Sequence, residues 1–290
     1  MTNKITLKKG VKIIDDSYVI KKCKNSLSDT YNYLLSRSFD YFPRIIKEDN
    51  GNIYYEYIAD ITEPKEQKII DLVILLSILH SKTTFYKEVD LDYYKETYES
   101  IDHKIDDIYN YYNELIDNID NEEYMSPANY LIARNITLIY KSLNYAKESI
   151  AKWYEMIPDK RKLRVVTTHG NLSLAHYLKS DKPYLISWDN SKIDMPIYDL
   201  VSLYKNNYLD FEFTDLLKIY LSKYPLTNEE LLLFLTLISI PDKIRAEKTE
   251  YATVIAIRKL LDYLYKTSLL RKEYRIKEKT DKSDKLQKQD

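Results

Sequence analysis

Two short strand-like segments interrupt a sequence that is otherwise helical from Pro64 onward, and they are Arg164–Thr168 and Tyr184–Trp188. Both are rich in β-branched and aromatic residues, whereas the apolar residues on either side recur at helical spacing. We expect the two segments to form a hairpin. Few folds place a single β-hairpin inside a run of helices this late in the chain. This feature therefore constrains the fold more than any other.

The first 60 residues have a different pattern, with short β-rich runs around one helical segment. The expected elements are Val11–Ile14, Ser17–Lys22, the helix from Ser28 to Arg37, Pro43–Lys47 and Ile53–Ile58. Asp15-Asp16 separates the first two strands, and Asp49-Asn50-Gly51 separates the last two. An Asx-Gly turn between apolar runs is a strong hairpin signal. We expect the order β-β-α-β-β within a five-stranded lobe over residues 5–60, joined to the next region near Glu56–Asp60.

The rest of the chain is predicted to be mainly helical, which makes the fold class α+β. The expected helices are Glu66–His80, Leu91–Ile119, Ala128–Met156, Asp210–Lys223, Asn228–Leu237 and Lys243–Arg271. Residues 272–290 are rich in Lys and Asp and have few apolar side chains, so we expect a disordered charged tail. The predicted domains are a β-rich lobe (1–60), a helical lobe (61–271) and this tail.

Charge and composition exclude several functional classes. With 44 Lys and Arg against 45 Asp and Glu, the chain lacks the basic field of a dedicated nucleic-acid binder. Cys23 is the only cysteine, which rules out an internal disulfide and favours a reducing cytosol. Residues 1–10 have no apolar signal core. The longest apolar runs, Leu72–Leu79 and Leu231–Ile240, are too short to span a membrane. We therefore expect a soluble cytoplasmic protein.

Three motifs follow one another between residues 165 and 200. The first runs from Val165 through His169-Gly170-Asn171 to His176. It resembles the H-G-D-x-x-x-x-N catalytic loop of the aminoglycoside phosphotransferase and choline kinase superfamily, whose fold is bilobal and protein-kinase-like. Leu185-Ile186-Ser187-Trp188-Asp189 resembles the metal-binding strand L-I-D-[FW]-[DE] of that superfamily, and Asp194–Leu200 resembles its D-x-P-x-x-D-L segment. Kinases also place a β-hairpin among helices, because its loops hold the catalytic and metal-binding groups.

Further segments resemble the CotS-like spore-coat branch of this superfamily. Leu75–His80 is similar to its L-A-x-x-H helix end, and Pro225–Glu230 with Ile240–Lys243 is similar to its P-L-S-x-E-E…P-x-K segment. The resemblance covers roughly residues 5–270. It implies an association with the bacterial spore coat and a protein partner, which we expect on the tyrosine-rich helices over Leu91–Met156. Exposed tyrosines there, such as Tyr109, Tyr111 and Tyr112, would bury a ring while keeping a wet hydroxyl.

The chain departs from the superfamily where the chemistry is most demanding. Phosphoryl transfer uses a catalytic-loop Asp as the base and an Asn and a second Asp as Mg²⁺ ligands. These positions hold Asn171, His176 and Ser187. An amide cannot take up a proton at neutral pH, and Mg²⁺ prefers oxygen ligands over an imidazole. Such a site should bind Mg-ATP poorly.

The parts that would hold the nucleotide are also reduced. Gly10 is the only glycine in the first fifty residues, so a glycine-rich loop is missing. Lys21, in Tyr18-Val19-Ile20-Lys21, corresponds to the phosphate-binding lysine, or is simply a solvated strand end. Asp29 is roughly placed as its acidic partner, and Glu56 is a further candidate nucleotide contact. We expect Phe, Tyr or Ile side chains of the β-rich lobe to fill part of the cleft.

The remaining polar residues have scaffold interpretations. The resemblance implies that His169 orients the loop backbone and that Asp199 braces it, while Asp199 could also serve as a helix N-cap. His80 is expected to be a cap or packing residue. Asp189 lies two residues after Ser187, so a strand would place both side chains on one face, and Asp189 could capture a metal ion with help from Asp194.

Two functions remain open at this point, because a third, an unrelated helical interaction protein, would require the three ordered motifs to be coincidental. The leading hypothesis is a pseudokinase that acts as a scaffold or spore-coat-associated protein, with no cofactor. The alternative is an active phosphotransferase that uses ATP and Mg²⁺ on an unknown small molecule or protein through a rearranged metal site. Whether the chain is an enzyme is therefore left undecided by the sequence.

Overall fold

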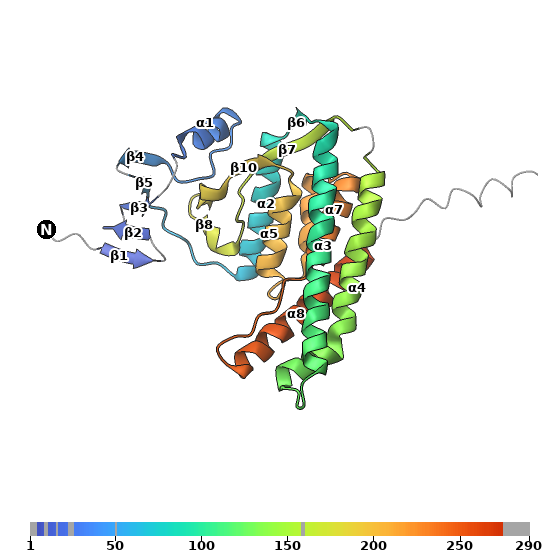
Figure 1. Ribbon diagram of the computed structural model, residues 1–290. Helices are drawn as coiled ribbons and strands as arrows, with labels where there is room; N and C mark the ends of the chain where they lie inside the picture. The colour runs from blue at the N-terminus through green and yellow to red at the C-terminus, as the bar shows by residue number, and fades with distance from the viewer. Residues whose placement is uncertain are drawn as a thin grey trace, which may run out of the picture. The chain divides into compact units, whose positions relative to one another are not determined.

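The computed structural model describes residues 5–8, 11–15, 17–22, 26–49, 51–157 and 160–274 (Figure 1). The chain divides into two compact units. The first consists of residues 1–93 and 159–226, and the second of residues 94–158 and 227–290. This division differs from the expected boundary at residue 60, which stays a prediction.

The first unit begins with a five-stranded antiparallel sheet in the order β1-β2-β3-β5-β4. Its strands are β1 (Ile5–Lys8), β2 (Val11–Ile14), β3 (Tyr18–Lys22), β4 (Ile45–Asp49) and β5 (Asn52–Glu56). The two predicted hairpins are present, and β3 lies between β2 and β5, with Lys21 opposite Ile53. The turn glycine Gly51 has φ +72°, while Asn50 lies outside the described residues. The sheet has five strands, as expected, but β1 was not among the four strands located from the sequence.

Helix α1 (Ser28–Ser36) leaves the sheet after β3 and ends within one residue of its predicted bound. It buries Tyr31 and Leu34. Phe42, in the segment that follows the helix, contacts the Tyr31 ring edge-on with the ring centroids 4.2 Å apart. This aromatic contact fastens α1 to the segment that leads into β4.

The remainder of the first unit is a helical body with several very short strands. Its helices are α2 (Lys65–Thr83), α5 (Ile197–Asn207) and α6 (Phe213–Lys223), and α2 packs against α6 and against strand β7 (Lys162–Thr168). The strand β7 is central to a small antiparallel sheet, with β6 (Phe85–Glu88) on one side and β10 (Lys192–Asp194) on the other. The short helices η1 (Leu174–His176) and η2 (Trp188–Asn190) lie in the loops after β7.

The predicted pairing of Arg164–Thr168 with Tyr184–Trp188 is wrong. Strand β9 (Pro183–Leu185) pairs instead with β8 (Tyr177–Lys179), and β7 pairs with β6 and β10. The second segment also stops being a strand at Leu185, because Ser187 adopts the left-handed conformation with φ +68°. Three-residue strands carry too few residues to show a period of two, which is why β8 and β10 were missed.

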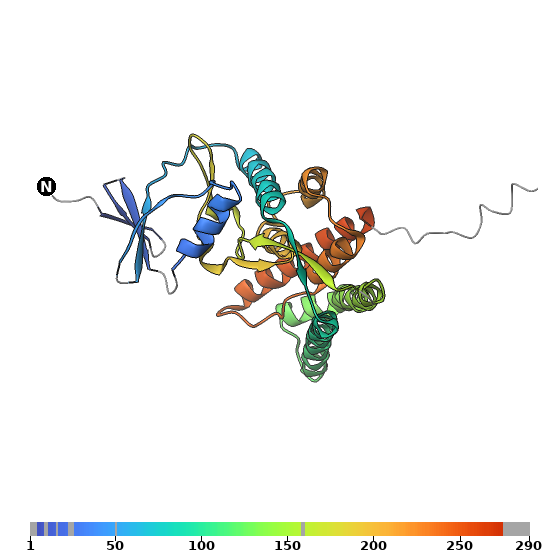
Figure 2. The same ribbon diagram turned by 90° about the horizontal axis from the view of Figure 1, so that it is seen from above.

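The second unit is a bundle built from α3 (Leu91–Asp120), α4 (Pro127–Glu155), α7 (Asn228–Ser239) and α8 (Glu250–Glu273). Helices α3 and α4 run side by side (Figures 1 and 2), joined by contacts such as the stacked rings of Tyr98 and Tyr154. Helix α4 packs against α7 and α8. The expected helix from Lys243 starts only at Glu250, where Thr249 caps it by accepting a hydrogen bond from the Ala252 amide.

The tyrosines named above on α3 are not all exposed. Tyr109 is 39% exposed, whereas Tyr112 is fully buried and donates its hydroxyl to the Asp242 carbonyl at 2.7 Å. The Tyr111 hydroxyl donates to the Ile244 carbonyl. The expectation that all three tyrosines are exposed is therefore wrong, because the helical period turns Tyr112 inward. In the described part of the chain, no helix combines the length and apolar character that crossing a bilayer requires.

Candidate functional site

The segment after β7 forms a tight loop around Gly170. This residue has φ +80°, a conformation that glycine adopts without steric cost. A Cβ atom placed on it would lie 2.0 Å from the backbone oxygen of Asn190. The loop and helix η2 are thus in direct backbone contact. Glycine is the only residue that allows both the turn and this close approach.

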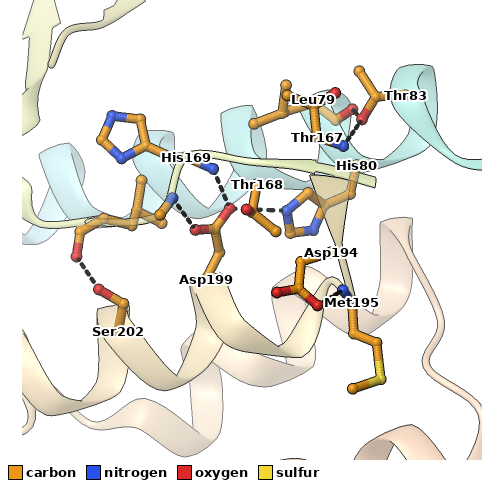
Figure 3. A network of polar contacts seen from close by, with 12 residues as sticks. Leu79, His80, Thr83, Thr167, Thr168, His169, Asp194, Met195, Asp199 and Ser202 are labelled. Carbon is orange, nitrogen blue, oxygen red and sulfur yellow. Dashed lines mark hydrogen bonds and ion pairs between the residues drawn. The ribbon is translucent and has the colours of Figure 1, made fainter. Parts of the chain in front are cut away.

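Asp199 holds this loop from below (Figure 3). Its side chain is fully buried in the first turn of α5, and its Oδ1 atom accepts a hydrogen bond from the Gly170 amide at 2.9 Å. The Oδ2 atom accepts one from the His169 amide at 2.8 Å and faces His80 Nε2 at 3.2 Å. The helix begins at Ile197 after Pro196. Asp199 therefore braces the loop, and the alternative role as an N-cap is wrong.

His80 continues this buried network into α6. Because a carboxylate only accepts hydrogen bonds, His80 Nε2 carries the proton toward Asp199, and His80 Nδ1 faces the Tyr220 hydroxyl at 2.6 Å. Burial alone would raise the pKa of Asp199. The hydrogen bond from His80 and the other contacts outweigh it and hold the pKa of Asp199 below its ordinary value. A carboxylate whose pKa is lowered, and which is therefore ionised near neutral pH, thus binds two loop amides.

His169 is buried and oriented away from Asp199 (Figure 3). Its Nε2 atom donates to the Ile186 carbonyl at 2.8 Å, and its ring lies 5.1 Å from the Trp188 ring. Burial lowers the pKa of His169, so the ring is neutral near pH 7. This geometry fits a loop-orienting role. The Nδ1 atom is buried and has no hydrogen-bond partner among the described residues.

The position that the motif resemblance assigns to a catalytic base carries a neutral, exposed side chain. Asn171 is exposed, and its backbone carbonyl accepts a hydrogen bond from His176 Nδ1 at 2.7 Å. His176 also receives the Ile186 amide on its backbone carbonyl at 2.9 Å. The His176 ring is thereby used to shape the loop. Neither side chain can act as a carboxylate.

Lys21 and the segment after β9 come together at the site. The Lys21 ammonium lies 3.3 Å from the Ser187 hydroxyl and forms an ion pair with the Asp189 carboxylate. Ser187 marks the left-handed turn that ends the strand, and Asp189 lies in helix η2. The expectation that a strand puts Ser187 and Asp189 on one face is therefore wrong. The lysine thus links β3 of the N-terminal sheet to the segment that follows β9.

Three other carboxylates that the sequence suggested, two as nucleotide contacts and one as a possible metal ligand, make contacts elsewhere. Asp29 is exposed in the first turn of α1, and no ion pair joins it to Lys21 among the described residues. The Glu56 side chain accepts a hydrogen bond from the Arg44 amide at 2.9 Å, which closes the end of the β4–β5 hairpin. Asp194 pairs with Lys192 at 2.6 Å and caps the Met195 amide at 2.8 Å. Among the described residues, none of these three carboxylates is part of a metal-holding group with Asp189.

The magnesium ion that the motif resemblance implies does not fit this donor set. Ser187 offers a neutral hydroxyl, the His176 Nδ1 atom is committed to a backbone carbonyl, and the Asp189 carboxylate is ion-paired with Lys21. Mg²⁺ demands near-octahedral oxygen coordination. Among the described residues, no group of three or more His, Cys, Asp or Glu side chains is arranged to hold a metal ion. A resident divalent cation therefore lacks its ligands here.

Aromatic side chains from the segment after α1 pack against Trp188, which follows the β8–β9 hairpin. The Trp188 ring is 1% exposed and meets the rings of Phe39 and Phe42 edge-on, with centroids 6.1 and 6.3 Å apart. The Tyr41 carbonyl also accepts the Leu185 amide at 2.8 Å. The sequence suggested aromatic filling from the N-terminal lobe but not these residues. Tyr220 was missed as well, since a helical tyrosine in a tyrosine-rich chain gives no distinctive signal.

Comparison with known proteins places the fold. No family model matches the chain, and no curated protein matches its sequence. An aminoglycoside phosphotransferase from Alicyclobacillus acidocaldarius subsp. acidocaldarius DSM 446 superposes with a TM-score of 0.69 over 93% of this chain and 92% of that protein, at 10% identity. The chain has a kinase-like phosphotransferase fold. This confirms the predicted class, with a small β-rich N-terminal region and a helical C-terminal region.

Two further solved structures have the same fold with lower scores. An AMP-bound spectinomycin phosphotransferase has a TM-score of 0.52 at 12% identity, covering 93% of this chain and 88% of that protein. A glucosamine kinase in complex with glucosamine, ADP and inorganic phosphate has a TM-score of 0.51 at 11% identity, covering 94% of this chain and 79% of that protein. Identities this low show the fold alone. Membership of the CotS-like branch stays a prediction.

Proposed function

We propose that this protein is a pseudokinase, a kinase-like binding module that does not transfer phosphate. One observation carries the proposal. The two positions where phosphoryl transfer needs a carboxylate carry the neutral side chains of Asn171 and Ser187, and the nearby carboxylate of Asp189 is ion-paired with Lys21. A catalytic base and a metal-bound phosphate are the two requirements of the reaction. Both are missing together.

The scaffold around the altered positions supports a role in binding. Asp199 still fixes the His169 and Gly170 amides, and the network continues through His80. A buried network of this kind specifies one loop conformation when every member is satisfied. The loop is thus held in a defined shape without the groups that would make it catalytic, as expected for a module that presents a surface.

The proposed partner is a protein, and the proposed setting is the bacterial spore coat. The setting rests on the resemblance of Leu75–His80 and Pro225–Glu230 to CotS-like segments. The α3–α4 pair offers exposed aromatic side chains for contact at its connecting end, where Tyr124 is 84% and Tyr130 is 54% exposed. Tyrosines of this kind are enriched at protein interfaces. A cytoplasmic location before coat assembly belongs to the same proposal.

An active phosphotransferase is the second candidate. The exposed position of Asp189 favours it, because a carboxylate there would become available if Lys21 moved away. The structural neighbours also include a glucosamine kinase with bound ADP. In this candidate, ATP and Mg²⁺ would be used with a site rebuilt around Asp189.

Transfer of labelled γ-phosphate separates the two candidates. The protein is incubated with ATP and either Mg²⁺ or Mn²⁺, together with acceptors of the classes that the neighbours name, an aminoglycoside, spectinomycin and glucosamine. The pseudokinase proposal expects no labelled product above the buffer control. Label on an acceptor or on the protein itself would support the phosphotransferase instead, provided that the Asp189→Asn variant produces no label.

A further inference from the structure

Lys21 places a positive charge where the motif resemblance expects a metal ion. Its ammonium group contacts both polar side chains that follow β9, the Ser187 hydroxyl at 3.3 Å and the Asp189 carboxylate in an ion pair. The Lys21 side chain is 25% exposed and that of Asp189 is 31% exposed. Both side chains are therefore mostly buried but still partly accessible to solvent.

The backbone on both sides of this contact is held firmly. Lys21 stands in the middle of its sheet, opposite Val11 of β2 and Ile53 of β5. On the other side, the backbone oxygen of Asn190 lies directly against Gly170. The ammonium group thus reaches Ser187 and Asp189 from a strand that is paired on both sides.

We propose that the Lys21 ammonium replaces the divalent cation of this site, so that the protein binds the phosphates of a nucleoside di- or triphosphate without a metal ion. The inference deepens the proposed function, since it names the ligand of a module that does not transfer phosphate. An ammonium group has three donors. Ser187 and Asp189 account for two, which leaves one for a phosphate oxygen that reaches the partly exposed ammonium group.

Magnesium should weaken this binding. Mg²⁺ would need the Asp189 carboxylate, which Lys21 already neutralises, and Ser187 and His176 are poor substitutes for the missing ligands. In addition, Mg²⁺ bound to the free nucleotide lowers its negative charge and hence its attraction to Lys21. The ordinary dependence of a kinase on Mg²⁺ is therefore reversed here.

Calorimetric titration of the full chain with ATP and with ADP tests the inference, once in EDTA and once in excess Mg²⁺. We expect binding in EDTA and weaker binding in Mg²⁺. Lys21→Met should weaken binding in EDTA by about tenfold or more, the effect of losing a charge-assisted hydrogen bond. Lys22→Met, at the exposed neighbouring position, is the matched control and should leave affinity unchanged.

A second substitution covers the case in which Lys21→Met does not fold. Lys21→Arg keeps the charge and should retain binding in EDTA. Binding that requires Mg²⁺, binding that is unaffected by Lys21→Met, or no binding of ATP or ADP in either buffer would overturn the inference. None of these results would by itself show that the protein transfers phosphate. The proposed function fails only if labelled phosphate reaches an acceptor, so the two failures are distinguishable.

Discussion

His80 Nε2 lies 3.2 Å from Asp199 Oδ2, and neither side chain is exposed to solvent. The pair joins the end of α2 to the start of α5, 119 residues apart in the sequence. Because the same carboxylate also binds the amides of His169 and Gly170, helix packing and loop shape depend on one another. The loop at His169 and Gly170 is thus held by buried hydrogen bonds that do not involve the side chains of Asn171 and Ser187.

Replacing Asp199 should destabilise the protein strongly. Asp199→Asn replaces the carboxylate that accepts hydrogen bonds from His80 and from two loop amides, and leaving buried donors without this charged acceptor costs about 3 kcal/mol. Urea unfolding followed by circular dichroism measures the change in the free energy of unfolding. Asp215→Asn, whose side chain is 77% exposed, is the control and should change it by less than about 0.5 kcal/mol. Equal effects of the two substitutions would refute the bracing role.

A methyl group at Gly170 should disrupt the contact between the loop and η2. Gly170→Ala meets the Asn190 oxygen at 2.0 Å in addition to the strain of φ +80°, so we expect a loss of about 2 kcal/mol or more. Gly51→Ala shares the positive φ at an exposed turn and should cost only about 1 kcal/mol. Thermal unfolding compares the two. A Gly170→Ala protein as stable as Gly51→Ala would show that η2 can move away freely.

Burial of His169 should make the protein less stable in mild acid. Its pKa is lowered in the folded state, whereas an unfolded imidazole has a pKa of about 6.5. Below that pH the unfolded chain binds a proton that the folded chain does not, so stability falls, by up to about 1.4 kcal/mol per pH unit. The loss begins as the pH drops through about 6.5 and ends at the lowered folded pKa.

The His169→Gln variant isolates this contribution. Its free energy of unfolding should lie closer to that of the wild type at pH 5.5 than at pH 7.5, because the variant lacks the titrating group. His103→Gln, at an exposed position on α3, serves as the control. A His169→Gln difference that stays constant over this range would mean that the imidazole is protonated equally in the folded and unfolded states.

The sequence predicted the large elements well and the small ones poorly. Helices such as α2 and α3 have many apolar residues at helical spacing, and the two N-terminal hairpins have turn residues that specify them. The pairing of β7 was wrong, because β6, β8 and β10 have three or four residues each and their partners are decided by tertiary contacts. The late start of α8 shows the same dependence on context.

At the candidate site, the sequence motifs showed which residue types are present but did not predict how those residues are arranged. The changes at Asn171, His176 and Ser187 were visible from the motifs, whereas the partner of Lys21 was predicted as Asp29 and is Asp189. That contact depends on the left-handed turn at Ser187, which nothing in the local sequence requires. The Tyr220–His80–Asp199 network likewise joins three helices and has no local signature.

The proposed partner surface can be tested with exposed tyrosines of the second unit. Tyr124→Ala and Tyr130→Ala should weaken capture of an identified coat partner without lowering the melting temperature, because both rings are more than half exposed. Tyr112→Ala should instead destabilise the fold, since that ring is buried. If Asn171 and Ser187 substitutions abolish capture while the tyrosine variants retain it, the partner docks at the altered site and this surface is wrong.

Hydrolysis of ATP in the presence of Mg²⁺, measured for the wild type and for the triple variant Asn171→Asp, His176→Asn, Ser187→Asp, tests the central claim most directly. The three changes restore the base and the metal ligands as a set, so each single change should do little. We predict phosphate release at the buffer background for the wild type and clearly above it for the triple variant. Release by the wild type that matches or exceeds that of the triple variant would contradict the account.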